Sequence, residues 1–180
     1  ASSTALWYTF RRPQRITALG GERVLGYLLE HTGRVRIRGP AGRDGLFAGT
    51  VVRTYAPIEA GDRIYPGPSS TSRARFLPRA APAIQGRILR HVGEESMLGQ
   101  GQMVVLNRGA RNGLEQGHVL EVRGAPRRVR DPDGGEAVRL PGRRKGVIMV
   151  VRTAGRLSFA LIIENTLPIK RGDRVAPPEG

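Results

Sequence analysis

The chain has 180 residues, a formal net charge of +15 at pH 7 and no cysteine. The lack of cysteine excludes disulfides, a thiol nucleophile and cysteine-bound zinc within it. No window approaches the roughly 18 uninterrupted apolar residues of a membrane-spanning helix, so we expect none.

Glycine (25 residues) and proline (13 residues) are frequent, whereas aromatic residues make up only 5%. This composition favours many short strands joined by tight turns over a helical bundle. We predict an all-β fold of two related small β-modules, barrel- or sandwich-like, with long Pro/Gly/Arg-rich loops and little helix.

The N-terminal part contains three β-forming segments. Residues 6–11 are rich in aromatic and β-forming side chains, residues 24–30 form a second apolar run, and residues 35–38 alternate apolar and basic side chains. Thr32-Gly33 is predicted to be a hairpin turn between the last two segments. Together with residues up to 68 these segments form the predicted N-terminal β-module, 1–68.

A boundary follows this module. Residues 66–83 contain four prolines and a Ser/Thr cluster without clear periodicity, which is typical of a linker or a long loop. We place that linker at residues 69–85 and the C-terminal β-module at residues 86–180.

The C-terminal module resumes the strand pattern. Its predicted strands are residues 87–92, 102–107, 118–123, 146–152 and 157–164. Asn112-Gly113 is a predicted structural turn, because both residues tolerate a positive φ.

An internal repeat links the two modules. Residues 47–66 and 159–177 share a β-branched run, a Pro-Ile step and a Gly-Asp turn, and a one-gap alignment equates Phe47 with Phe159. Such self-similarity predicts equivalent strands in the two modules.

The Gly-Asp steps of the repeat are predicted structural turns. In Gly61-Asp62 and in Gly172-Asp173, glycine can adopt the left-handed conformation and aspartate can accept backbone N–H groups.

Chemistry-bearing patterns are sparse. The three histidines are isolated from one another in the sequence, and no Gly-x-Ser-x-Gly elbow occurs. We therefore predict a protein that is not an enzyme, with no cofactor and no catalytic, cofactor-binding or metal site.

Residues 124–145 are basic and rich in proline and glycine, and a solvated loop is their simplest interpretation. As a binding surface they could meet nucleic acid, anionic lipid or an acidic polymer. No Phe, Trp or Tyr lies within residues 108–150, which disfavours base stacking there. The candidate basic surface consists of Arg127, Arg128, Arg130, Arg143, Arg144 and Lys145.

Four phrases together resemble a known family. They are residues 20–27, the long run 104–120, the short run 138–141 and residues 146–160. In this combination they are similar to the C-terminal region of LysM-domain, peptidoglycan-binding envelope proteins of Gram-negative bacteria. The resemblance covers about residues 10–178, and no part of the chain resembles the LysM module itself.

The resemblance implies an exported, periplasmic scaffold region. Its partners would be envelope proteins, or peptidoglycan held indirectly through a separate LysM module. Two alternatives remain open: a basic nucleic-acid-binding β-barrel module, and a domain associated with a cell-wall hydrolase. The identity of the partner and the oligomeric state do not follow from the sequence.

Overall fold

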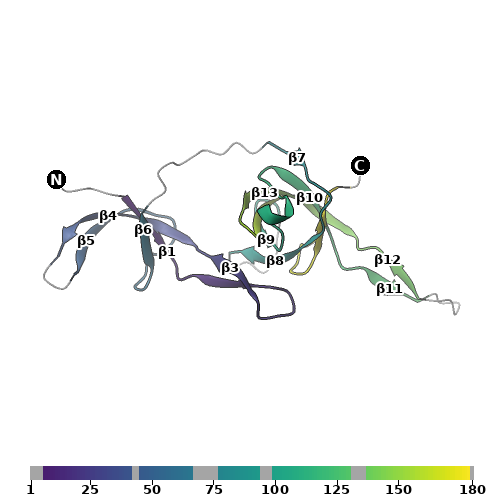
Figure 1. Cartoon of the computed structure of the whole chain (residues 1–180), viewed down its shortest axis with the longest axis horizontal. Coiled ribbons are helices and arrows are strands. Elements are labelled where there is room, and N and C mark those ends of the chain that lie inside the picture. Colours follow the sequence, from purple (N-terminus) through teal and green to yellow (C-terminus); the bar gives the residue numbers. More distant parts are fainter. Residues whose placement is uncertain (1–5, 42–44, 67–76, 94–98, 131–136, 179–180) are drawn as a thin grey trace. The chain divides into compact units, whose positions relative to one another are not determined.

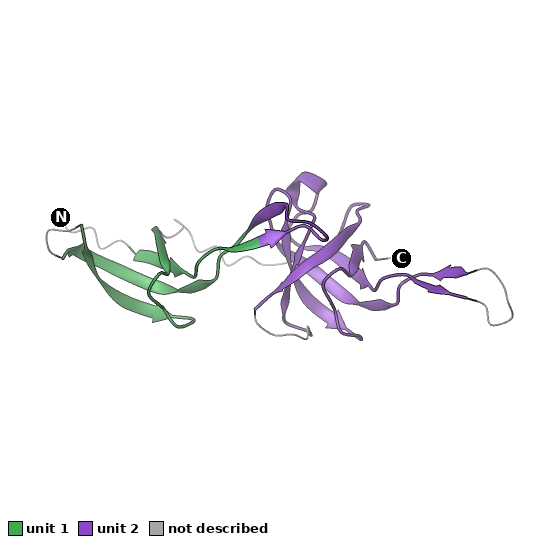
Figure 2. Cartoon of the chain, turned by 90° about the horizontal axis from the view of Figure 1, so that it is seen from below, with its two compact units in different colours: residues 1–15, 27–74 green, residues 16–26, 75–180 purple. Residues whose placement is uncertain are grey.

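The computed structural model of the chain describes residues 6–41, 45–66, 77–93, 99–130 and 137–178 (Figure 1). Regular structure in these residues is β-strand, apart from the short 3₁₀ element η1, Ala110–Asn112. The prediction of an all-β fold with little helix is therefore confirmed. The chain divides into two compact units, residues 1–15 with 27–74 and residues 16–26 with 75–180 (Figure 2).

The second unit contains a closed six-stranded β-barrel. Its strands are β8 (Gly86–Val92), β9 (Met103–Leu106), β10 (His118–Arg123), β13 (Arg144–Thr153), β14 (Ser158–Asn165) and β15 (Arg174–Ala176). Hydrogen-bonded neighbours follow the order β13-β14-β9-β8-β15-β10, and β10 pairs with β13 to close the ring. The core consists of Ile88, Val104, Leu106, Leu114, Leu120, Val122, Ile148, Val150, Ala160, Ile162, Ile169 and Val175.

The first unit contains an open four-stranded antiparallel sheet in the order β5-β4-β1-β6. Its strands are β1 (Leu6–Phe10), β4 (His31–Pro40), β5 (Phe47–Thr54) and β6 (Arg63–Pro66). Every residue of β5 and of β6 is exposed. Within the part of the chain that the structure describes, these two outer strands each keep one unpaired edge.

The open sheet repeats most of the barrel. The strands β1, β4, β5 and β6 occur in the same chain order and sheet order as β10, β13, β14 and β15. A two-stranded hairpin interrupts both copies after the first strand, formed by β2 (Gln14–Thr17) with β3 (Val24–Leu28), and by β11 (Arg127–Val129) with β12 (Val138–Leu140). Only the barrel, among the described residues, has the additional pair β8 and β9.

The strand registers show that the duplication extends to single residues. The register irregularity between β1 and β4 recurs between β10 and β13, and both irregularities between β4 and β5 recur between β13 and β14. Inward positions can therefore be matched one to one. The matched residues are Trp7 with Leu120, Thr9 with Val122, Val35 with Ile148, Ile37 with Val150, Gly49 with Ala160, Val51 with Ile162, and Ile64 with Val175.

The register also corrects the predicted alignment of the repeat. Phe47 pairs with Pro40, and Ser158 pairs with Thr153 at the matching position, so Phe47 corresponds to Ser158 and not to Phe159. The gap in the sequence alignment was wrong. A shift of one residue would have moved inward side chains to the outer face, so packing decides the register over residue identity.

Both Gly-Asp turns have the same local geometry. Gly61 and Gly172 have φ values of +98° and +91°, in the left-handed region. Each aspartate accepts the backbone N–H of the residue three positions earlier, at 3.3 Å for Asp62 and 2.7 Å for Asp173. The repeat thus encodes a capped turn that returns the chain to the sheet.

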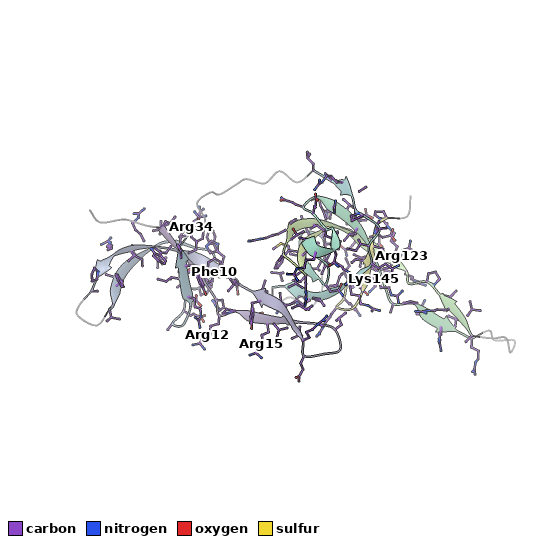
Figure 3. The ribbon with its side chains drawn as sticks, in the orientation of Figure 1. Phe10, Arg12, Arg15, Arg34, Arg123 and Lys145 are labelled. Carbon is purple, nitrogen blue, oxygen red and sulfur yellow. The ribbon has the colours of Figure 1, made fainter. Side chains whose placement is uncertain are left out.

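The two capping carboxylates meet different partners at matching positions of β4 and β13. The Thr32 hydroxyl donates to Asp62 at 3.0 Å. The Lys145 ammonium, labelled in Figure 3, lies 2.7 Å from Asp173, so the barrel uses an ion pair where the open sheet uses a neutral donor.

The outer faces of the copies also differ in chemistry. In the barrel, four matching positions form an ion-pair cluster of Glu121, Arg123, Arg144 and Glu164. In the first unit the same positions are Tyr8, Phe10, His31 and Arg53. The His31 ring lies 5.1 Å from the Tyr8 ring, which the guanidinium of Arg34 covers at 5.0 Å (Figure 3). Ring stacking and cation–π contact replace ion pairs there.

Two local predictions about the loops change. Thr32-Gly33 lies inside β4 and is not a hairpin turn, because Gly33 pairs with Thr9 on one side and with Thr54 on the other. Within the predicted linker, β7 (Arg79–Ala80) pairs in parallel with β10, whereas residues 69–76 lie outside the described residues. The described residues include no helix long and apolar enough to cross a membrane.

Candidate anion-binding surface

The second unit carries a pocket of about 560 Å³ whose charged lining residues are all arginines. They are Arg23, Arg87, Arg108, Arg111 and Arg156. No aspartate or glutamate lines this pocket, and none of the five arginines forms an ion pair with the residues that the structure describes. Five guanidinium groups around one pocket repel one another and attract an anion.

Backbone hydrogen bonds hold η1 against the β13–β14 turn and so bring two arginines of the pocket together. The Arg111 N–H donates to the Gly155 carbonyl at 2.9 Å, next to Arg156. The close approach requires glycine at position 109, where a Cβ would lie 2.2 Å from the Ala154 carbonyl oxygen.

The predicted turn at Asn112-Gly113 belongs to the same structure. The Asn112 side-chain oxygen accepts the Gly109 N–H at 3.2 Å, and Gly113 ends η1 with φ at +78°. Asn112 also lines the arginine pocket. This turn therefore shapes the pocket as well as linking η1 to the barrel.

Asn107 places two further arginines of the pocket. Its side-chain oxygen accepts the Arg87 backbone N–H at 2.7 Å, and its carbonyl accepts Nη1 of Arg108 at 3.1 Å. Arg87 also donates to the Gly172 carbonyl at 3.2 Å. The ends of β8 and β9 thus hold both guanidinium groups at the pocket.

A second pocket of about 420 Å³ adjoins the first, because Arg87, Asn107 and Arg108 line both. It adds the cations Arg123 (labelled in Figure 3) and Arg174. Its one lining carboxylate, Glu121, pairs with Arg123 and with Arg144. Together the two pockets form a continuous basic surface on the barrel unit, which we call the arginine surface.

The predicted basic residues occupy a different place. Arg127, Arg128, Arg130 and Arg143 are exposed on or beside the β11–β12 hairpin, and none of them lines either pocket. Arg144 pairs with Glu121 at 3.0 Å and Lys145 with Asp173 at 2.7 Å, so both serve the fold. The structure does not bring the six residues into one site.

Sequence reasoning missed the arginines of the pockets. The run from Asn107 to Asn112 carried a visible signal, since it places Arg108 and Arg111 beside a strong turn. Arg23 and Arg156 gave none, because each is one of many arginines in loops. Only the folded chain shows which of them face the same pocket.

The described residues contain no group of three His, Asp or Glu side chains that could hold a metal ion. Neither the models of protein families nor the curated protein sequences match this chain.

Proposed function

We propose that this chain is a non-catalytic binding module of the bacterial cell envelope that holds a linear anionic polymer on the arginine surface. The observation that carries the proposal is the larger pocket, in which five arginines converge without a carboxylate. Arginine binds carboxylate and phosphate groups through paired hydrogen bonds, and two adjoining pockets suit a ligand with repeated anionic groups.

The envelope location rests on the resemblance of residues 10–178 to regions that accompany LysM modules. A separate LysM module would hold the whole protein at peptidoglycan, while the barrel unit contacts a polyanion nearby. The carboxylate-bearing peptides of peptidoglycan belong to this class of ligand. The role is therefore that of an accessory scaffold.

The test measures binding of the 180-residue chain to inorganic polyphosphate by fluorescence anisotropy, and its retention on purified peptidoglycan. The double variant Arg108→Gln/Arg111→Gln removes two cations of the larger pocket. We expect the affinity for polyphosphate to fall roughly tenfold to hundredfold, because each lost contact is a charge-assisted hydrogen bond. The slope of log K against log salt should fall by roughly 1.5, and retention on peptidoglycan should fall in parallel.

The matched control is Arg127→Gln/Arg128→Gln, which removes the same charge from exposed positions outside both pockets. It should leave affinity within about threefold of the parent chain. Equal losses in both variants would show that net charge alone drives binding and would refute the site. Much tighter binding of single-stranded DNA than of polyphosphate would favour the nucleic-acid alternative.

A further inference from the structure

The first unit exposes a face that is buried in the barrel. Val51 is 52% exposed, whereas its counterpart Ile162 is fully buried at 0%. Ile64 is 47% exposed, and its counterpart Val175 is 2% exposed. Trp7, Val35 and Ile37 on the same face are half-buried, although all their counterparts lie in the barrel core.

The barrel shows what covers this face. Strand β9 pairs with β14, where Val104 faces Ala160, and β8 pairs with β15, where Gly86 faces Val175. The inward residues Ile88, Val104 and Leu106 then complete the core. In the first unit, β5 and β6 offer unpaired edges at the positions where β14 and β15 receive those strands.

We propose that the first unit is an incomplete copy of the barrel that binds a β-hairpin from a separate polypeptide, in the place that β8 and β9 occupy in the second unit. One strand of the hairpin pairs antiparallel with β5 and the other with β6. Main-chain hydrogen bonds along two edges supply affinity, and the apolar face supplies selectivity.

The chemistry of the hairpin follows from the surface that it meets. None of the first-unit residues matched to barrel-core positions carries a charge, so the inward side chains of the hairpin are apolar and alternate along each strand. The edge strands carry exposed Arg53 and Arg63, which form no ion pair with described residues. Acidic side chains on the outward positions of the hairpin complement these arginines.

A second copy of the chain is a weaker candidate for this place. Its own β8 and β9 are committed to its barrel, and its open sheet lacks the same two strands. Association of two identical sheets also brings together chains that each carry a charge of +15. The occupant is therefore a hairpin of another polypeptide.

The probe is a synthetic peptide with the sequence of residues 86–107, which contains β8 and β9 of this chain. Trp7 is the only tryptophan and lies on the open face, so its emission reports the covering of that face. Adding the peptide to the full chain should shift the Trp7 emission to shorter wavelength in a saturable manner, and a scrambled peptide should not. Amides on the edges of β5 and β6 should gain protection from hydrogen exchange.

The test variant is Val51→Lys, which places an ammonium group on the inward face. It should weaken peptide binding at least about tenfold, because that charge would have no partner in the covered core. The matched control is Val52→Lys. Val52 is 48% exposed, and its counterpart Ile163 lies outside the barrel core, so this variant should bind within about threefold of the parent.

A fusion of residues 86–107 to the N-terminus raises the effective concentration of the hairpin to about millimolar and keeps weak binding detectable. In this fusion the Trp7 emission should be shifted without added peptide. An unshifted emission in the fusion, together with unprotected edge amides, would overturn the proposal. A Trp7 shift that depends on the concentration of the chain alone, with formation of a dimer, would assign the face to a second copy and also overturn it.

Discussion

Replacing Asp173 with alanine should destabilise the barrel by about 3 kcal/mol. The carboxylate is 6% exposed and accepts Nζ of Lys145 at 2.7 and 2.9 Å, and the Lys170 N–H at 2.7 Å. Its removal leaves an ammonium without its partner on a side chain only 15% exposed. Breaking a buried ion pair costs about 3–5 kcal/mol, and partial solvation of the lysine places this case at the lower end.

The duplicated position in the open sheet is the natural control. Asp62→Ala removes a hydrogen bond from the neutral Thr32 hydroxyl and an ion pair with the partly exposed Arg11. That loss should cost about 1 kcal/mol. Lys145→Thr transfers the donor of the first unit to the barrel, so the double variant Lys145→Thr/Asp173→Ala leaves no orphaned ammonium. The coupling energy between positions 145 and 173 should be about 2 kcal/mol.

Native-state hydrogen exchange with mass spectrometry separates the two effects, because peptides from β10 and β13 report the barrel and peptides from β1 and β4 report the open sheet. The reasoning fails if Asp173→Ala destabilises β10 and β13 no more than Asp62→Ala destabilises β1 and β4. It also fails if the coupling energy is below about 0.5 kcal/mol.

Two further predictions concern packing and can be measured by urea denaturation. Gly146→Ala should destabilise the barrel by about 2 kcal/mol or more, because the new Cβ would lie 2.2 Å from the Glu164 carbonyl oxygen. Gly99→Ala, whose nearest atom would be 3.9 Å away, should change stability by less than about 0.5 kcal/mol, and equal effects would contradict the steric reading. Val150→Ala empties a position with 0% exposure and should cost about 2 kcal/mol. Val51→Ala, at a position 52% exposed, should cost less than about 0.5 kcal/mol unless something covers the open face.

Local features of the fold could be predicted from the sequence because they depend on neighbouring residues. Glycine and proline content with short β-branched runs indicated an all-β chain, and the Gly-Asp steps indicated capped turns. The repeat indicated related strands, since both copies solve the same local problem with a glycine at positive φ and a carboxylate acceptor. The duplication of the whole strand order was not visible, because few residues outside the repeat are shared.

The candidate site shows the opposite case. The basic loop at residues 124–145 stood out because its charges are adjacent in sequence, yet Arg144 and Lys145 are paired with carboxylates distant in the chain. The arginine surface gathers side chains from the β2–β3 hairpin, the ends of β8 and β9, η1 and the β13–β14 turn. In a chain with this many arginines, no local pattern distinguishes those that converge from those that do not.

The repeated phrase marks the division between the two kinds of information. By itself the sequence determined that residues 47–66 and 159–177 form strand, turn and strand, because backbone preferences and hydrogen-bonding side chains act over a few residues. Only the tertiary structure decided that one copy closes into a barrel while the other stays open. Closure depends on β8 and β9, which pair with β15 and β14 across the chain and for which the first unit has no described counterpart. The same inward positions are therefore core in one unit and exposed surface in the other.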